Sequence, residues 1–411
     1  MTTRLWCDVF LNPLLLDEIA SFLKRPYVLD AVCQQVLNLR AEYGKYYSSI
    51  HWLQQLGEER MHKRVRNLKS QMCLRVFDLD KVALKRIQAV ASLEVEIYYT
   101  NLHNLKFLEN VVSLHLDSQS PRCLIDLVDV SRGWATKLRV LTLHCDELED
   151  LSPLFEFRYS LKELNIRFRW KHIDIKPLSE LLKLEILQLD GPSSDIAALK
   201  SLQRLRKLSF YGLRINDISP LLSFPKLEAI NLSLTQDISV LPQFKKLQEL
   251  VLYRANVREY TPIQLIDSLT GLAIYSCSVH DLGLIRKLKL KWFEIISEHA
   301  LDFSPLNEIS TLERLKIECR SCSLYPLTNL HQLISFKIWY LQVSNLDFVH
   351  DMPKLEYLEF YGAKVLCGQV HQIAVMYPAL KIRGHIDCPH SPQFVMHMMS
   401  IGRRKCPSYL E

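Results

Sequence analysis

The sequence contains little glycine, and this scarcity excludes protein classes that depend on glycine-rich loops. Only 11 of its 411 residues are glycine, and no stretch is rich in Gly, Ser or Pro. It has no glycine-rich phosphate-binding loop, no nucleophile elbow and no His-Glu-x-x-His helix. We therefore expect a protein that is not an enzyme, holds no cofactor or metal ion, and has no flexible linker between separate domains.

Long apolar runs are also lacking. No segment approaches the 18 or so uninterrupted apolar residues of a membrane-spanning helix, and the N-terminal residues do not have the pattern of a secretion signal. The 11 cysteines are scattered and mostly flanked by apolar residues, as is typical of reduced, buried thiols. These features predict an intracellular protein, cytoplasmic or nuclear, with no membrane partner.

Potential metal ligands and basic residues occur only in small groups. Cys319 and Cys322 have metal-ligand spacing, but no second such pair accompanies them. The net charge is +6, from 51 basic and 45 acidic residues, with short basic clusters at 62–69, 286–291 and 403–405. Dedicated nucleic-acid binders show stronger clustering, so a protein partner is favoured and RNA binding is the alternative.

The sequence is instead rich in one repeated pattern, apolar-x-x-apolar-x-apolar. From Leu161 to Tyr377 its copies begin 20 to 23 residues apart. Earlier copies begin at Val90, Val111 and Leu138, and a less regular one lies near Gln71. Regular spacing over this length indicates a chain built from stacked structural repeats.

Each copy predicts a strand followed by a short helical return. In the copy that starts at Leu247, Leu250 and Leu252 alternate as on a strand and point into the core, while Tyr253 points outward. About ten residues later an apolar pair follows a Pro, which predicts the start of a short helix or 3-10 turn. The clearest examples begin at Asp150, Asp217, Asp302 and Ser323.

These residues resemble leucine-rich repeats of the 22-residue class, as in internalins and a phosphatase-1 regulatory subunit. The resemblance covers about residues 90 to 382 and implies an α/β solenoid, a horseshoe with a parallel concave sheet and short helices or 3-10 turns on its convex side. The turn asparagine of that class is replaced here, for example by Thr235, Ala255 and Cys277. We expect repeats over 71–383 and an irregular tail over 384–411.

Residues 1–70 precede the repeats and have two interpretations. Apolar residues at helical spacing are typical of a helical cap that covers the open end of a solenoid. The segment 11–36 also resembles an F-box, although the tryptophan usual after its Val-Cys pair is replaced by Val36. The residues that match the F-box pattern are Leu15, Leu16, Ile19, Leu23, Val32 and Cys33.

The concave face is the expected binding surface, because solenoid partners usually lie against it. The outward position after the last apolar strand residue is Tyr or Trp in five of eleven copies, and a neighbouring column adds two more aromatic residues. Exposed aromatic residues with a polar tip are typical of binding hot spots, although the same rings can pack on one another. The candidate partner-binding residues are Tyr211, Tyr253, Tyr275, Trp292, Trp339, Tyr357 and Tyr361.

The sequence thus predicts a protein–protein interaction module. The most specific hypothesis is a substrate adaptor of a cullin–RING ubiquitin ligase, with the F-box-like segment docking the ligase's adaptor subunit and the concave face holding a client. The alternatives are a non-catalytic scaffold or regulatory subunit of a larger assembly, resembling the phosphatase regulator or a ribonucleoprotein component, and a pathogen effector.

Overall fold

The computed structural model describes residues 72–76, 93–98, 102–108, 110–118, 120–168, 172–192, 196–212, 215, 217–255, 257, 259–319, 323–324, 327–343, 345–365 and 367–387. The chain divides into two compact units, Met1–Pro192 and Ser193–Glu411. We call them the N-terminal unit and the C-terminal unit, and describe each by itself. The predicted cap or F-box segment, 1–70, and the tail beyond Asp387 lie outside the described residues.

The N-terminal unit consists of consecutive parallel strands joined by short helices. Each strand from β1 to β5 pairs with the next one along the chain. The strands are β1 (Met72–Val76), β2 (Leu93–Tyr98), β3 (Val111–Asp117), β4 (Val140–His144), β5 (Glu163–Arg167) and β6 (Ile186–Asp190). The helices are the 3-10 helices η1 (Leu102–Phe107), η2 (Ser152–Phe157) and η3 (Lys176–Glu180), and the α-helix α7 (Cys123–Ser131).

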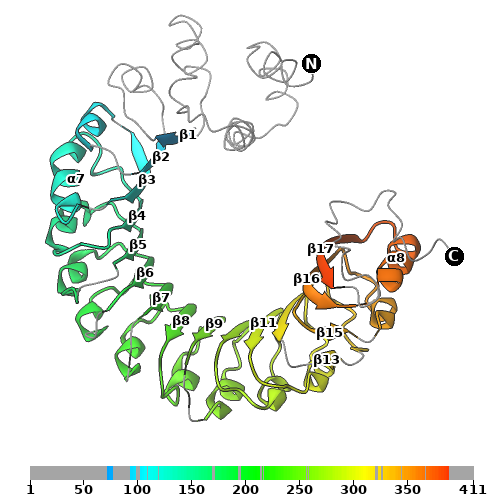
Figure 1. The fold of residues 1–411 in the computed structure, drawn as a ribbon. Coiled ribbons are helices and arrows are strands. Elements are labelled where there is room, and N and C mark those ends of the chain that lie inside the picture. Colours follow the sequence, from blue (N-terminus) through cyan, green and yellow to red (C-terminus); the bar gives the residue numbers. More distant parts are fainter. Residues whose placement is uncertain are drawn as a thin grey trace, which may run out of the picture. The chain divides into compact units, whose positions relative to one another are not determined.

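The C-terminal unit repeats this arrangement. Its strands line the inner side of a curve and its 3-10 helices lie on the outer side (Figure 1). The strands are β7 (Lys207–Tyr211), β8 (Ala229–Ser233), β9 (Glu249–Tyr253), β10 (Gly271–Tyr275), β11 (Trp292–Ser297), β12 (Arg314–Cys319), β13 (Ser323–Leu324), β14 (Ser335–Trp339), β15 (Gln342–Val343), β16 (Tyr357–Lys364) and β17 (Lys381–Asp387). The helices are η4 (Ile196–Leu199), η5 (Ser219–Ser223), η6 (Leu241–Gln243), η7 (Thr261–Leu265), η8 (Leu282–Ile285), η9 (Ser304–Glu308), η10 (Asp347–Asp351) and α8 (Cys367–Met376).

The strands alternate in burial as the sequence pattern predicts. In β9, Leu250 and Leu252 are fully buried, while Val251 and Tyr253 are partly accessible on the opposite face. The parallel register aligns equivalent residues of neighbouring repeats, so that Leu250 lies beside Leu272 and Tyr253 beside Tyr275. The predicted leucine-rich-repeat solenoid is therefore confirmed in each unit, and β1 confirms the least regular copy, near Gln71.

Aspartate side chains start most of the 3-10 helices. The Oδ1 atom of Asp217 accepts a hydrogen bond from the backbone N–H of Ser219 at 2.8 Å, and Asp150 and Asp302 do the same two residues ahead. The hydrogen bonds from Ser219 lower the pKa of the Asp217 carboxyl group, because they stabilise its charged form. The helical returns predicted at these three aspartates are confirmed.

The return predicted at Ser323 is wrong. Ser323 and Leu324 form the short strand β13, which pairs with β15. A serine stands here in place of the aspartate whose carboxylate caps the equivalent returns at Asp217 and Asp302. A second departure is the nine-residue α-helix α7, which occupies the longer interval between β3 and β4.

Buried side chains at the turn position of the repeat take over the role of the missing asparagine. The hydroxyl of Thr235 donates to the backbone carbonyl of Ile215 at 3.2 Å. The Sγ atom of Cys277 accepts from the backbone N–H of Ala255 at 3.3 Å, and burial raises the pKa of this thiol. Polar bonding between repeats is thus kept at these two positions, whereas Ala255 contributes only its backbone.

Among the described residues, three cysteines are free and buried as predicted, namely Cys123, Cys145 and Cys277. Cys319 instead is disulfide-bonded. The prediction of reduced thiols is therefore wrong for Cys319. None of the helices within the described ranges is long and apolar enough to cross a membrane.

Candidate recognition surfaces

The register of the C-terminal unit places all seven candidate aromatic residues on the inner face of its strands. Tyr253 lies beside Tyr275 on neighbouring strands, and Trp339 lies beside Tyr361. Five of the seven side chains are half-buried, while Tyr357 and Tyr361 are exposed by 38% and 50%. The structure therefore brings the candidate residues onto one face, as the alternation of the strands requires.

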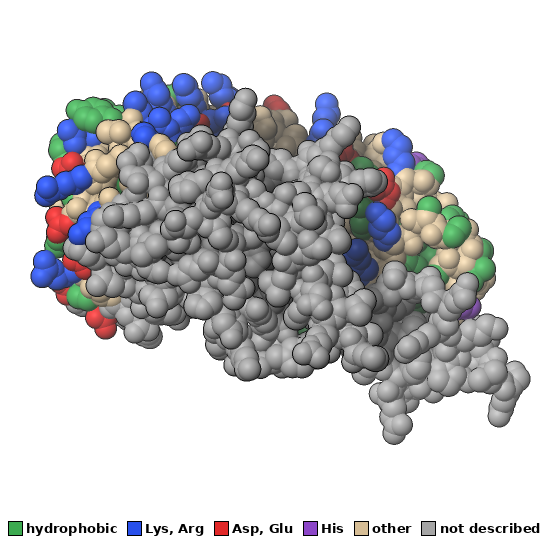
Figure 2. All heavy atoms as spheres, turned by 90° about the horizontal axis from the view of Figure 1, so that it is seen from above, with side chains coloured by type: hydrophobic (Ala, Val, Ile, Leu, Met, Phe, Trp, Pro, Cys, Tyr) green, Lys and Arg blue, Asp and Glu red, His purple; other side chains and the backbone are tan. Residues whose placement is uncertain are grey.

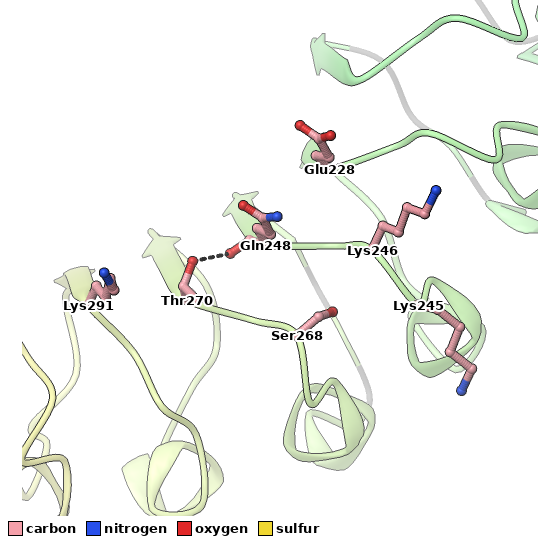
Figure 3. A pocket seen from close by; sticks show the side chains of 7 residues that line it. All are labelled: Glu228, Lys245, Lys246, Gln248, Ser268, Thr270 and Lys291. Atoms are coloured by element: carbon pink, nitrogen blue, oxygen red, sulfur yellow. Dashed lines mark hydrogen bonds between the residues drawn. The ribbon is translucent and has the colours of Figure 1, made fainter.

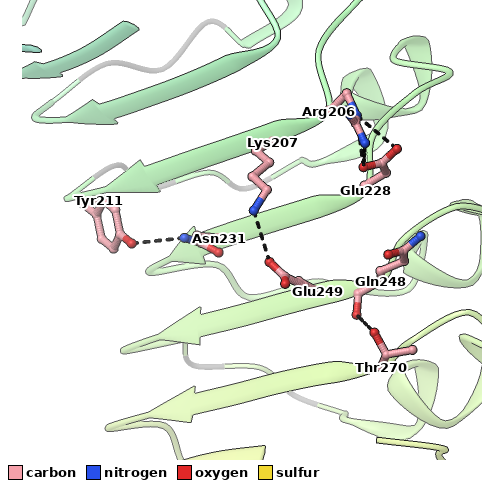
Figure 4. A network of polar contacts seen from close by, with 8 residues as sticks. All are labelled: Arg206, Lys207, Tyr211, Glu228, Asn231, Gln248, Glu249 and Thr270. Carbon is pink, nitrogen blue, oxygen red and sulfur yellow. Dashed lines mark hydrogen bonds and ion pairs between the residues drawn. The ribbon is translucent and has the colours of Figure 1, made fainter. Parts of the chain in front are cut away.

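Three of these tyrosines are held by hydrogen bonds to the neighbouring strand, and the hydroxyl of Tyr357 accepts from the Nζ atom of Lys381 on β17 at 3.1 Å. The hydroxyl of Tyr211 accepts from the side-chain amide of Asn231 at 3.0 Å (Figure 4). The hydroxyl of Tyr275 donates to the carboxylate of Glu294, and burial together with this carboxylate raises the pKa of Tyr275. These bonds fix the direction of the rings and reduce the rotamer entropy that binding would otherwise cost.

Trp292 is positioned by a glycine on the adjacent strand. A Cβ atom at Gly271 would lie 2.1 Å from the Trp292 indole, so the ring covers the backbone of Gly271. The two residues are direct partners in the pairing of β10 with β11. Gly271 thus provides the space in which Trp292 lies against the sheet, a pairing that the repeat pattern alone does not reveal.

Trp339, Tyr340 and Tyr361 form an aromatic cluster in which the Tyr361 ring contacts both others and Lys316 lies over Trp339. The ring centroids of Trp339 and Tyr361 are 5.5 Å apart, and those of Tyr340 and Tyr361 are 5.3 Å apart. The Nζ atom of Lys316 lies 3.7 Å from the Trp339 ring, close enough for a cation–π interaction. The indole N–H of Trp339 has no hydrogen-bond partner among the described residues. In this cluster the aromatic rings therefore pack on one another, which was the alternative to a role as binding hot spots.

Tyr340 was not among the predicted site residues. It follows the last strand residue in a left-handed conformation, with a φ of 57°, as do Arg254 at 48° and Ser276 at 51°. Glycine occupies the equivalent position at Gly212 and Gly362. Tyr340 could therefore be found from its repeat position, one residue after the aromatic column. The left-handed conformation at that position costs a residue other than glycine about 1–2 kcal/mol.

Basic residues gather where the strands β7 to β11 begin. The five segments that enter these strands, 203–207, 225–228, 245–249, 267–270 and 286–291, form what we call the basic rim. Figure 2 shows Lys and Arg side chains collected along one edge of the visible face. The rim holds ten basic residues and three acidic ones, namely Arg204, Arg206, Lys207, Lys226, Lys245, Lys246, Arg286, Lys287, Lys289 and Lys291, with Glu228, Glu249 and Asp267.

Ion pairs between repeats one or two apart neutralise part of this rim. The guanidinium of Arg206 binds both carboxylate oxygens of Glu228, Oε2 at 2.7 Å and Oε1 at 3.1 Å (Figure 4). Lys207 reaches Glu249 at 3.7 Å. At the repeat position of Arg206 and Glu228, the next two repeats carry the uncharged Gln248 and Thr270. The ladder of ion pairs is therefore interrupted in the middle of the rim.

A hollow of about 540 Å³ lies at this interruption. It is lined by Glu228, Lys245, Lys246, Gln248, Ser268, Thr270 and Lys291 (Figure 3). The hydroxyls of Ser268 and Thr270 donate to the backbone carbonyls of Leu247 and Gln248, which leaves them only acceptor capacity. The donors that remain for a bound molecule are the lysine ammonium groups and the Gln248 amide.

The N-terminal unit carries a histidine pair on its strand face. The rings of His115 and His144 meet edge to face, 4.8 Å between centroids. Burial lowers the pKa of His144, and the neighbouring His115 lowers it further. No group of three metal-ligating side chains occurs within the described ranges. The six F-box-like residues lie outside the described residues, so their prediction is not tested.

The comparisons with known proteins found similar solved structures but no family model. No protein-family model matches the sequence, and no curated protein matches it. Among solved structures, an internalin of Listeria monocytogenes is 19% identical, over 73% of this chain and 88% of that one, with a TM-score of 0.46. A leucine-rich-repeat protein of Leptospira interrogans is 17% identical, over 78% and 97%, with a TM-score of 0.43.

A third similar structure is a plant receptor. The leucine-rich-repeat ectodomain of the Arabidopsis thaliana receptor kinase GASSHO1/SCHENGEN3, in complex with Casparian strip integrity factor 2, is 15% identical. The match covers 77% of this chain and 41% of the receptor chain, with a TM-score of 0.44. By the register and returns of its own strands, the chain is a leucine-rich-repeat solenoid protein; the 22-residue class stays a prediction.

Proposed function

We propose that this protein is a non-catalytic recognition subunit that binds another protein through the aromatic residues on the strand face of its C-terminal unit. The observation that carries the proposal is the exposure of Tyr357 and Tyr361, beside the Trp339 cluster, on a hydrogen-bonded sheet. Large apolar rings with polar tips gain binding energy with little loss of side-chain entropy, because two torsions fix them.

The first test replaces Tyr253, Tyr357 and Tyr361 by alanine in the full chain. Each true hot spot contributes about 1–3 kcal/mol, so we expect the Kd for a partner to rise by a factor of 100 or more for the triple variant. The partner is first isolated by crosslinking to the wild-type chain and then titrated as a purified protein by calorimetry. Circular dichroism establishes that the variant keeps its fold.

The matched control removes exposed apolar side chains from the helical side instead. Phe155, Leu182 and Leu265 are exposed beside or within η2, η3 and η7. Their triple alanine variant is expected to bind the partner within about twofold of wild type. Equal losses in the two variants, or none in the first, would contradict recognition through the strand face.

We propose further that the chain is a substrate adaptor of a cullin–RING ubiquitin ligase, working in the cytoplasm or nucleus. The support is the F-box-like pattern of Leu15, Leu16, Ile19, Leu23, Val32 and Cys33, followed in the sequence by leucine-rich repeats. In this arrangement, residues 11–36 bind the ligase's adaptor subunit, while the strand face holds the client protein.

Charged substitutions in the F-box-like segment test the adaptor proposal. Leu15→Asp with Ile19→Asp, in the full chain, is expected to remove ligase subunits from affinity-purified material while client binding persists. The tyrosine triple variant is expected to show the reverse pattern, which makes each variant the control of the other. Recovery of one large assembly without any ligase subunit would favour the scaffold alternative.

A further inference from the structure

The basic rim carries more positive charge than the ion pairs around it can neutralise. Its basic residues exceed its acidic ones by seven, whereas the net charge of the whole chain is only +6. Of its three acidic residues, Glu228 and Glu249 are already paired with Arg206 and Lys207, and Arg286 and Lys291 pair with Glu308 and Glu313 outside the rim. The rim therefore has a local positive potential that the mild net charge of the chain conceals.

The positive potential of the basic rim is most accessible to a ligand at the hollow. Lys246 has no acidic side chain within ion-pair distance in the described part of the chain. Lys245 donates to the backbone carbonyl of Pro242 at 3.3 Å, which leaves two of its N–H groups available. Lys291 lies 3.7 Å from Glu313 and remains exposed. The ammonium groups of Lys246 and Lys291 lie on either side of a floor formed by Gln248, Ser268 and Thr270, whereas the Lys245 side chain extends away from that floor toward the Pro242 carbonyl (Figure 3).

We propose that this hollow binds an acidic, carboxylate-bearing segment of the protein partner. The inference rests on the proposed protein-binding function and names the chemistry of a second contact, outside the aromatic face. Lysine ammonium groups bind carboxylates as point charges on flexible stems, so they tolerate variation in the acidic sequence. Complementary charge of this kind mainly raises the association rate and weakens as salt is added.

The lining residues favour an acidic peptide over a nucleic acid. None of the seven side chains that line the hollow is aromatic, so no ring is available for a base to stack on. The carboxylate of Glu228 also lies in the lining, and it would repel a continuous phosphate backbone. A peptide whose acidic residues alternate with neutral ones can avoid Glu228 and still reach the lysines.

The test measures binding of a fluorescein-labelled peptide of ten glutamates to the full chain by fluorescence anisotropy. Lys245→Glu, Lys246→Glu and Lys291→Glu together are expected to weaken binding at least about tenfold, and wild-type binding is expected to fall between 50 and 200 mM NaCl. The matched control reverses three other exposed lysines, Lys183, Lys200 and Lys364, with the same change in net charge. It is expected to stay within about twofold of wild type.

Several outcomes overturn the proposal. Equal weakening in rim and control variants means that net charge alone attracts the peptide. If the peptide does not bind, or if the rim variant binds it with unchanged affinity, the proposed site is wrong. A labelled decauridylate that binds more tightly than the peptide and is lost in the rim variant assigns the hollow to nucleic acid. The variant with alanine at Tyr253, Tyr357 and Tyr361 is expected to keep peptide binding. A failure of the proposed function would therefore appear in the partner-binding assay and not in the peptide assay.

Discussion

Replacing Trp134 by alanine is expected to destabilise the N-terminal unit by about 3–5 kcal/mol. Trp134 is fully buried, and its indole N–H donates to the backbone carbonyl of Leu105 at 3.2 Å. Its own carbonyl accepts from the backbone N–H groups of Lys137 and Leu138, directly before β4. The substitution removes the largest fully buried side chain of the unit and leaves the Leu105 carbonyl with the backbone N–H of Leu108 as its remaining donor.

Urea denaturation followed by circular dichroism measures this loss, and two further variants separate its causes. Trp134→Phe keeps most of the apolar area and loses only the hydrogen bond, so about 1–3 kcal/mol is expected. Ile125→Ala, at an exposed position of α7, is expected to cost less than about 1 kcal/mol. A loss below about 1 kcal/mol for Trp134→Ala would show that the first described repeats do not depend on this packing.

The strands could be predicted from the sequence because their burial follows a simple alternation of apolar and other residues. An apolar residue at every second position of a short segment must face a core, and the spacing of 20 to 23 residues places the segments side by side. The helical returns were predictable where an aspartate caps them, as at Asp217 and Asp302. The prediction failed at Ser323, because a serine there does not provide the carboxylate that binds the start of the returns at Asp217 and Asp302.

The candidate surfaces were predictable only in part. Alternation along the strands determines which face Tyr253, Tyr357 and Tyr361 occupy, so they could be found from the sequence. The cover of Gly271 by Trp292 depends on contacts between strands, which follow from the register and the rotamers. Lys246 and Lys291 lie two repeats apart, and their shared hollow becomes apparent only when the repeats are aligned.

Replacing Gly384 by alanine is expected to separate β17 from β16. Gly384 has a φ of 114°, and a Cβ atom there would lie 1.7 Å from the carbonyl oxygen of Phe360 on the paired strand. Backbone on both sides must move to remove this overlap, since neither partner is the end of a flexible side chain. The cost, on the order of 3 kcal/mol, is expected to speed amide exchange in Lys381–Asp387 roughly 100-fold.

The effect is expected to stay local because a repeat contacts only its neighbours. Among the described strands, β17 pairs only with β16, so its release leaves the pairing of β9 with β10 intact. Hydrogen exchange followed by mass spectrometry should therefore show faster exchange in 381–387 and unchanged protection in β9 and β10. The control is Gly133→Ala, where a Cβ atom meets only the Leu108 carbonyl at an ordinary 3.4 Å and exchange should not change. Faster exchange throughout the C-terminal unit would instead mean that its repeats unfold as one cooperative block, and the nearest-neighbour account would fail.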